Sequence, residues 1–134
     1  MTKVVFACVH NAGRSQMARA FFERVADPAK AIAVSAGTHP AERVHREVVD
    51  AMAEVGIDLS DARPQMLTPE LATGSSLLVT MGCGDECPYI PGAIVEDWPL
   101  DDPRGKDPAV VRAIRDEVRS KVERLVASRN WGSS

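Results

Sequence analysis

The sequence has no surplus of positive charge, no long apolar run and few aromatic residues. Its 16 Lys and Arg residues are outnumbered by 19 Asp and Glu residues, for a formal net charge of −3. This balance gives no indication of binding to nucleic acid or to an anionic membrane surface. No apolar run reaches the length of a membrane span, and the N-terminus lacks the pattern of a signal peptide. We therefore expect a cytoplasmic protein.

Cysteine is also scarce. The three cysteines, Cys8, Cys83 and Cys87, are odd in number and unevenly spaced, which excludes the even framework typical of small secreted disulfide proteins. In a reducing compartment such a set indicates catalytic or metal-binding chemistry. The length of 134 residues predicts one domain, residues 1–134, large enough to bury a substantial core.

The most informative segment lies between Cys8 and Ser15. It contains a cysteine, an arginine and a serine in the pattern Cys-x5-Arg-Ser, and the residues between are Val9, His10, Asn11, Ala12 and Gly13. It follows an apolar run, 4–7, and precedes a predicted helix from Ser15 to about Ala26. A strand that turns tightly into a helix presents free backbone N–H groups and the positive end of the helix dipole.

An oxyanion fits that position, and the same field favours the thiolate form of a cysteine placed on it. The planar guanidinium of Arg14 can bind two oxygens of a tetrahedral anion. The segment therefore predicts a Cys8 thiolate beneath a bound oxyanion. The alternative is a buried, inert cysteine at a strand end with a solvated arginine beside it.

Strand and helix patterns alternate along the rest of the chain. Apolar runs predict strands at 31–34, 77–80 and, more weakly, 93–95. Helical spacing predicts helices over 44–55, from a Thr68-Pro69 cap to about 73, and from Asp107-Pro108 onward with an apolar face of Val111, Ile114, Val118, Val122 and Leu125. The C-terminal residues 131–134 are expected to be frayed. Alternating elements predict an α/β fold with a parallel sheet and helices on both faces, with ligands at the carboxyl ends of the strands.

Cys83 and Cys87 follow the strand at 77–80. Four-residue spacing puts both thiols on one face if the segment forms a helical turn, within reach of a disulfide after a small rearrangement. Three thiols near an oxyanion pocket favour a thiol relay over simple hydrolysis. Two alternatives stay open: the pair is inert, or it binds zinc together with Cys8 and either His10 or a carboxylate.

On these residues the chain resembles the superfamily of low-molecular-weight tyrosine phosphatases and arsenate reductases. The V-T-M end of the third strand, the cysteine pair before Pro88 and the later D-D-P-R-G-K segment are similar to thioredoxin-coupled arsenate reductases. The resemblance implies a four-stranded parallel sheet in the order 2-1-3-4. It also implies that Cys8 is the nucleophile, that Arg14 binds arsenate, with phosphate or sulfate as competing anions, and that thioredoxin or a similar dithiol reduces a Cys8/Cys83/Cys87 relay.

The chain departs from that family pattern at two places. Gly82 stands where the middle cysteine usually follows the strand, so that Cys83 comes one residue later and the gap to Cys87 is shorter. Some members bind potassium with an asparagine matching Asn11 and a glutamate on the first helix, where this chain has Arg19. We therefore expect no strong potassium site, and no metal or cofactor.

Asp101, Asp102 and Pro103 supply the candidate acid. Proline holds the preceding residue extended, and loss of hydroxide from an oxyanion needs a proton donor. The resemblance implies Asp102, directly before the proline; Asp101 is the rival, and an ordinary surface turn is the alternative.

Other functions remain possible for these residues. A phosphatase for phosphotyrosine or small phosphate esters would use Cys8, Arg14 and Asp102 in the same way, but the chain has few aromatics to line a phosphotyrosine pocket. A low-molecular-weight thiol, mycothiol or glutathione, could replace thioredoxin. From a different class, the protein could be a non-enzymatic module that binds an oxyanion or zinc.

Overall fold

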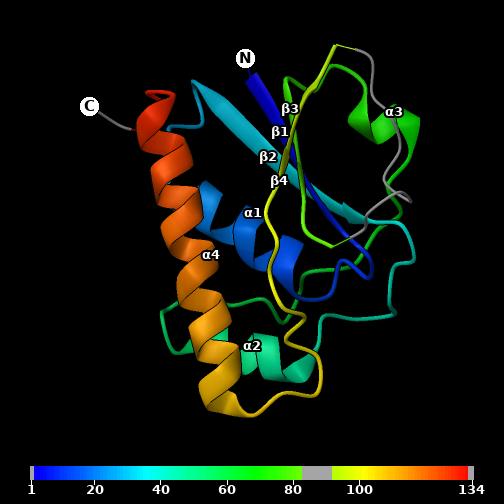
Figure 1. Cartoon of the computed structure of the whole chain (residues 1–134), viewed down its shortest axis with the longest axis vertical. Helices are drawn as coiled ribbons and strands as arrows, with labels where there is room; N and C mark the ends of the chain where they lie inside the picture. Colours follow the sequence, from blue (N-terminus) through cyan, green and yellow to red (C-terminus); the bar gives the residue numbers. More distant parts are fainter. Residues whose placement is uncertain (1, 83–91, 133–134) are drawn as a thin grey trace.

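The computed structural model describes residues 2–82 and 92–132, which form a sheet with helices around it (Figure 1). The strands are β1 (Thr2–Cys8), β2 (Ala31–Gly37), β3 (Leu77–Thr80) and β4 (Ile94–Asp97). The helices are α1 (Arg14–Val25), α2 (Arg46–Ala53), α3 (Pro69–Ala72) and α4 (Pro108–Ser128). The predicted alternation of strands and helices is confirmed, and β2 continues three residues beyond the predicted end.

All strand pairs are parallel, and their order is β2-β1-β3-β4. The order implied by the family resemblance is therefore confirmed. Cys8 pairs with Gly37 at the end of β1, and Ala7 pairs with Thr80 at the end of β3. Because parallel strands end at the same edge, this register brings the 8–15 segment beside the chain that leaves β3.

Alternate residues of β1 and β3 pack into two separate cores. Val4, Phe6 and Cys8 face a core shared with α1, α2 and α4. Val5 and Ala7 face a smaller core, closed by Leu67 and Ala72 around α3. Figure 1 shows α4 and α3 on opposite sides of the strands. This two-sided burial explains why the central strands are apolar without alternation.

Helix α4 carries a buried charge that its apolar face does not predict. All five predicted core residues of α4 are buried, but so is Arg115, which donates to the Ala51 carbonyl and to Glu54, 2.8 Å away in each case. Arg112 also binds Glu54. These contacts join the C-terminal end of α2 to α4.

The expectation of a fully frayed C-terminus is wrong for Trp131 and Gly132. The Trp131 ring lies against Phe22, with centroids 5.9 Å apart, and its carbonyl accepts from the Asp27 N–H. Gly132 bridges Ala26, and its carbonyl accepts from Lys30. The partial burial of the Trp131 ring against the core, together with these hydrogen bonds, offsets the entropy that residues at a chain end lose on ordering. None of the described helices has the length and apolar character that a membrane span requires.

Candidate active site

The loop from Cys8 to Gly13 turns its carbonyl groups outward. The carbonyls of Cys8, Val9, His10 and Ala12 accept hydrogen bonds from the N–H groups of 38, 39, 41 and 45. Within the described residues, no acceptor is assigned to the N–H groups of 9–13. Helix α1 also begins at Arg14 without a side-chain cap. The loop and the helix start therefore offer unpaired donors and a positive dipole end to an anion.

Cys8 lies at the bottom of this loop. The residue is 2% exposed, and its Sγ lies 2.9 Å from Oγ of Ser15. Ser15 Oγ in turn accepts a hydrogen bond of 2.7 Å from Asn11 Nδ2. Asn11 is fully buried and has a left-handed backbone with φ of 50°, a conformation that asparagine tolerates better than most residues. The cysteine thus contacts Ser15 at the start of α1, and Asn11 of the loop holds that serine.

Arg14 reaches across the loop toward the segment after β4. Its side chain is buried, and Nη1 donates to the Leu100 carbonyl over 3.0 Å. One donor of the guanidinium is therefore held by the backbone, which fixes the plane of the group. Apart from Nη2, which lies near Asp102, the other guanidinium donors have no acceptor within the described residues and can bind oxygens of an anion.

Asp102 lies beside Arg14, with 3.8 Å between Asp102 Oδ2 and Arg14 Nη2. The Arg104 N–H donates to Asp102 Oδ1 over 3.0 Å and fixes the carboxylate. Pro103 packs on Gly13, where a Cβ would come within 3.0 Å of Pro103 Cγ. Asp101 is exposed and lines a hollow with Gly82 and Leu100. Arg14 forms its ion pair with Asp102 and not with the Asp101 carboxylate.

Two histidine side chains, His10 and His45, lie beside the loop and form no hydrogen bond with Cys8. The His45 N–H donates to the Ala12 carbonyl, and its ring lies 6.4 Å from that of His10. Burial lowers the pKa of His45 from its usual 6.5, and the nearby Glu47 and Asp102 carboxylates oppose this only in part. The lowered pKa favours the neutral form of the His45 imidazole. His10 Nδ1 contacts the His39 carbonyl over 3.0 Å.

Cys83 and Cys87 lie outside the described residues, so their predicted pairing is not placed. Gly82, the last described residue before this gap, has φ of 95°, and a Cβ at this position would overlap Arg14 Nη1. Gly82 therefore belongs to the wall around the guanidinium. Its positive φ also accounts for a glycine directly after the strand.

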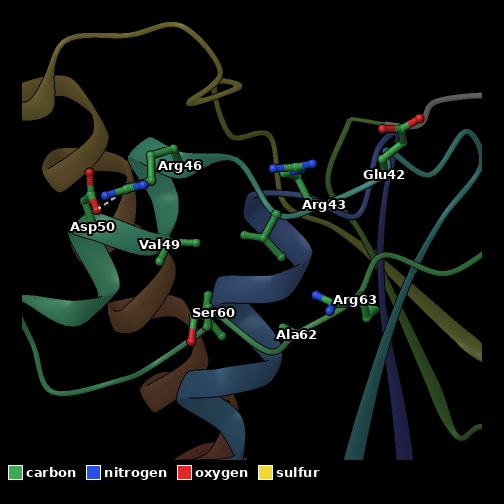
Figure 2. Close-up of a pocket in the computed structure, with 10 residues that line it drawn as sticks. Glu42, Arg43, Arg46, Val49, Asp50, Ser60, Ala62 and Arg63 are labelled. Carbon is green, nitrogen blue, oxygen red and sulfur yellow. Dashed lines mark hydrogen bonds and ion pairs between the residues drawn. The ribbon is translucent and has the colours of Figure 1, made fainter.

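A separate cavity of about 710 Å³ lies between α2 and residues 59–63 (Figure 2). Arg46 and Asp50 of α2 form an ion pair at its rim, and Arg43 and Arg63 flank it from two different segments. Cys8 and Arg14 do not line it. The Arg63 carbonyl, however, accepts from Gln16 of α1, so this wall is connected to the loop around Asn11.

Three members of the site were not expected from the sequence. They are the Leu100 carbonyl, Gly82, which approaches Arg14 closely, and Gln16. Gln16 is 2% exposed and donates a hydrogen bond to Asn11. Gln16 follows the Cys-x5-Arg-Ser pattern directly, and a polar residue on the inner face of α1 was the available signal. A backbone carbonyl leaves no signal in a sequence.

Comparison with known proteins places these residues in context. Residues 3–130 match the family model described as "Low molecular weight phosphotyrosine protein phosphatase". A relative from Halobacterium salinarum named "Putative arsenate reductase" is 42% identical over 127 residues, covering 90% of this chain and 88% of that protein. A Synechocystis protein named "Glutaredoxin arsenate reductase" is 36% identical, covering 95% of this chain and 98% of that protein.

Among solved structures, a thioredoxin-dependent arsenate reductase of Corynebacterium glutamicum superposes with a TM-score of 0.82 at 38% identity. The match covers 96% of this chain and 61% of that longer chain. The relatives thus share both the fold and most of the length of this chain.

Proposed function

The chain belongs to the low molecular weight phosphotyrosine protein phosphatase family, and we propose that within this family it is an arsenate reductase. The observation that carries the proposal is the placement of Cys8 at the start of a loop whose N–H groups have no acceptor among the described residues, with the Arg14–Asp102 ion pair beside it. The names of the relatives at 36–42% identity support arsenate as the substrate. Phosphate and sulfate are competing anions of the same shape.

In the first step the Cys8 thiolate attacks arsenic, and an As–O bond breaks. Arg14 and the loop N–H groups stabilise the charge on the remaining oxygens. Asp102 protonates the leaving oxygen, which departs as water. Its position next to Arg14 and its fixed Oδ1 support this role, because a general acid must lie within reach of the leaving group.

In the second step Cys83 attacks the sulfur of Cys8. The S–As bond breaks, its electron pair reduces arsenic from the +5 to the +3 state, and arsenite leaves. The Cys8–Cys83 disulfide is then attacked by Cys87, which frees Cys8 and moves the disulfide to Cys83–Cys87. The described chain approaches Arg14 at Gly82, one residue before Cys83, which supports a thiol entering from this side.

An external dithiol, thioredoxin or a protein like it, reduces the final disulfide. The thioredoxin-dependent relative supports this partner. The glutaredoxin name of the Synechocystis relative favours a second candidate, in which a low-molecular-weight thiol, such as glutathione or mycothiol, attacks the Cys8 adduct. The two reductants can be distinguished because only the first requires both Cys83 and Cys87.

The test is arsenate-dependent oxidation of NADPH by the purified protein. Thioredoxin with its reductase is compared with glutathione, glutaredoxin and glutathione reductase, and with the mycothiol system. We expect turnover with thioredoxin and none after Cys8→Ser, because a serine hydroxyl does not ionise near neutral pH. Hydrolysis of a phosphate ester without arsenate turnover under any reductant would instead identify a phosphatase, and zinc binding without turnover would identify a binding module.

A further inference from the structure

Four side chains of the α1 region form a continuous series of hydrogen bonds that ends at Cys8. Arg19 Nη2 donates to Gln16 Oε1 over 3.1 Å, and Gln16 Nε2 donates to Asn11 Oδ1 over 3.2 Å. Asn11 Nδ2 then donates to Ser15 Oγ over 2.7 Å, and Ser15 Oγ contacts Cys8 Sγ over 2.9 Å. The inner members are buried, so water does not compete for these bonds.

The orientation of the Asn11 amide follows from its neighbours. The backbone N–H of Gln65 can only donate, and it lies 3.0 Å from Asn11 Oδ1. Oδ1 must therefore face Gln65, which turns the Asn11 NH2 group to Ser15. Because that NH2 group occupies a lone pair of Ser15 Oγ, the Ser15 hydroxyl hydrogen is free to point at the Cys8 sulfur.

Gln16 is oriented by the same reasoning. The guanidinium of Arg19 has no acceptor atom, so the amide oxygen of Gln16 must face it. The Gln16 NH2 group then faces inward, where three oxygens surround it: Asn11 Oδ1 at 3.2 Å, the Asn11 carbonyl at 3.1 Å and the Arg63 carbonyl at 3.4 Å. Glu23 forms an ion pair with Arg19 and holds the outer end of the series.

From this geometry we propose that Gln16 and Arg19 are positioning residues, which fix Asn11 so that every donor in the series points toward Cys8. Gln16 contacts both the side chain and the backbone carbonyl of Asn11, and so it holds this residue in its left-handed conformation. Donors aligned in one direction polarise one another, and the last hydrogen bond favours an anionic sulfur over a neutral thiol. The proposal rests on the proposed role of Cys8 as the nucleophile.

The test measures the reactivity of Cys8 directly. Gln16→Met keeps a similar side-chain length but has no N–H donor, and Arg19→Met removes the outer donor from a partly exposed position. Gln65→Met is the matched control. In the wild-type protein the side-chain amide of Gln65 donates a hydrogen bond to the Ser35 carbonyl, and only this bond is lost in the variant. The backbone N–H of residue 65 still donates to Asn11 Oδ1. Iodoacetamide labelling of Cys8 is followed by peptide mass spectrometry from pH 5 to 10, with thermal melting to confirm folding.

We expect Gln16→Met to label Cys8 about threefold to tenfold more slowly at pH 7, with the midpoint of the rate profile moved to higher pH. Arg19→Met should move the profile in the same direction by a smaller amount, and Gln65→Met should leave it in place. If folded Gln16→Met and Arg19→Met both keep the wild-type profile, the positioning role is wrong. Labelling needs neither arsenate nor reductant, so a protein without arsenate turnover would contradict the proposed function and leave this result intact.

Discussion

Arg14 Nη2 lies 3.8 Å from Oδ2 of Asp102, although the two residues are far apart in the sequence. Arg14 is the first residue of α1, and Asp102 belongs to the segment between β4 and α4. Parallel strands bring both segments to one edge of the sheet. The pair therefore supports the proposed mechanism, in which Arg14 binds oxygens of the anion and Asp102 donates a proton to one of them.

Asp102→Asn should slow the release of the first water by roughly 100-fold or more, because it removes a general acid and keeps the anion cradle. Single-turnover formation of arsenite measures this step, and phosphate binding by calorimetry should be nearly unchanged. Asp101→Asn is the matched control from the adjacent residue. A slow Asp101→Asn protein beside a fast Asp102→Asn protein would assign the acid to Asp101.

Gly82→Ala should weaken anion binding, because a Cβ at this position displaces Arg14 Nη1 from its place. Gly74→Ala is the control, since Gly74 has a similar φ of 80° with no atom within 4 Å of a Cβ. Both substitutions should lower the free energy of unfolding by about 1 kcal/mol through backbone strain. Phosphate affinity should fall only in Gly82→Ala, and equal affinities in the two variants would show that Gly82 does not restrict Arg14.

The thiol relay predicts a different trapped species for each cysteine variant. With arsenate and no reductant, the wild-type protein should stop after one turnover with a Cys83–Cys87 disulfide. Cys87→Ser should release arsenite once and stop as Cys8–Cys83, and Cys83→Ser should stop earlier with arsenic on Cys8. Disulfide mapping by mass spectrometry identifies each species. Full multiple turnover of both variants with thioredoxin would rule out the relay and favour a small thiol.

Glu54→Gln should destabilise the protein at neutral pH but not near pH 2. Hydrogen bonds from Arg112, and then from Arg115, lower the pKa of Glu54 from 4.5 to about 2 in the folded protein. Because the folded pKa lies below the unfolded value, the stabilisation is complete above about pH 4.5 and is lost as the pH falls to about 2.

Thermal melting of wild-type and variant proteins across pH 2–7 measures this difference in stability. Glu123→Gln provides the comparison, because Glu123 forms one exposed ion pair of 3.6 Å with Arg119. Such surface pairs contribute little to stability, so the melting temperature should change less there. A difference for Glu54→Gln that stays constant down to pH 2 would contradict the role of the two arginines.

The sequence by itself determined the parts of this protein that depend on neighbouring residues. Apolar runs and helical spacing predicted the strands and helices, because burial on a strand or helix face repeats with a fixed period. Thr68 caps α3 as its position before Pro69 predicted. The pattern from Cys8 to Ser15 indicated an anion-binding loop for the same reason, since the loop, the helix start and Arg14 are contiguous in the chain.

The tertiary structure decided what depends on residues distant in the chain. Asp101 and Asp102 are neighbours with the same chemistry, and only the packing of Pro103 on Gly13 places one of them beside Arg14. The burial of Arg115 depends on Glu54 from another element, and the order of Trp131 depends on Phe22. Likewise, the orientation of the Asn11 amide, and with it the direction of its hydrogen bond to Ser15, is set by the backbone N–H of Gln65. Each of these depends on a partner brought close by the fold, and local periodicity carries no information about such partners.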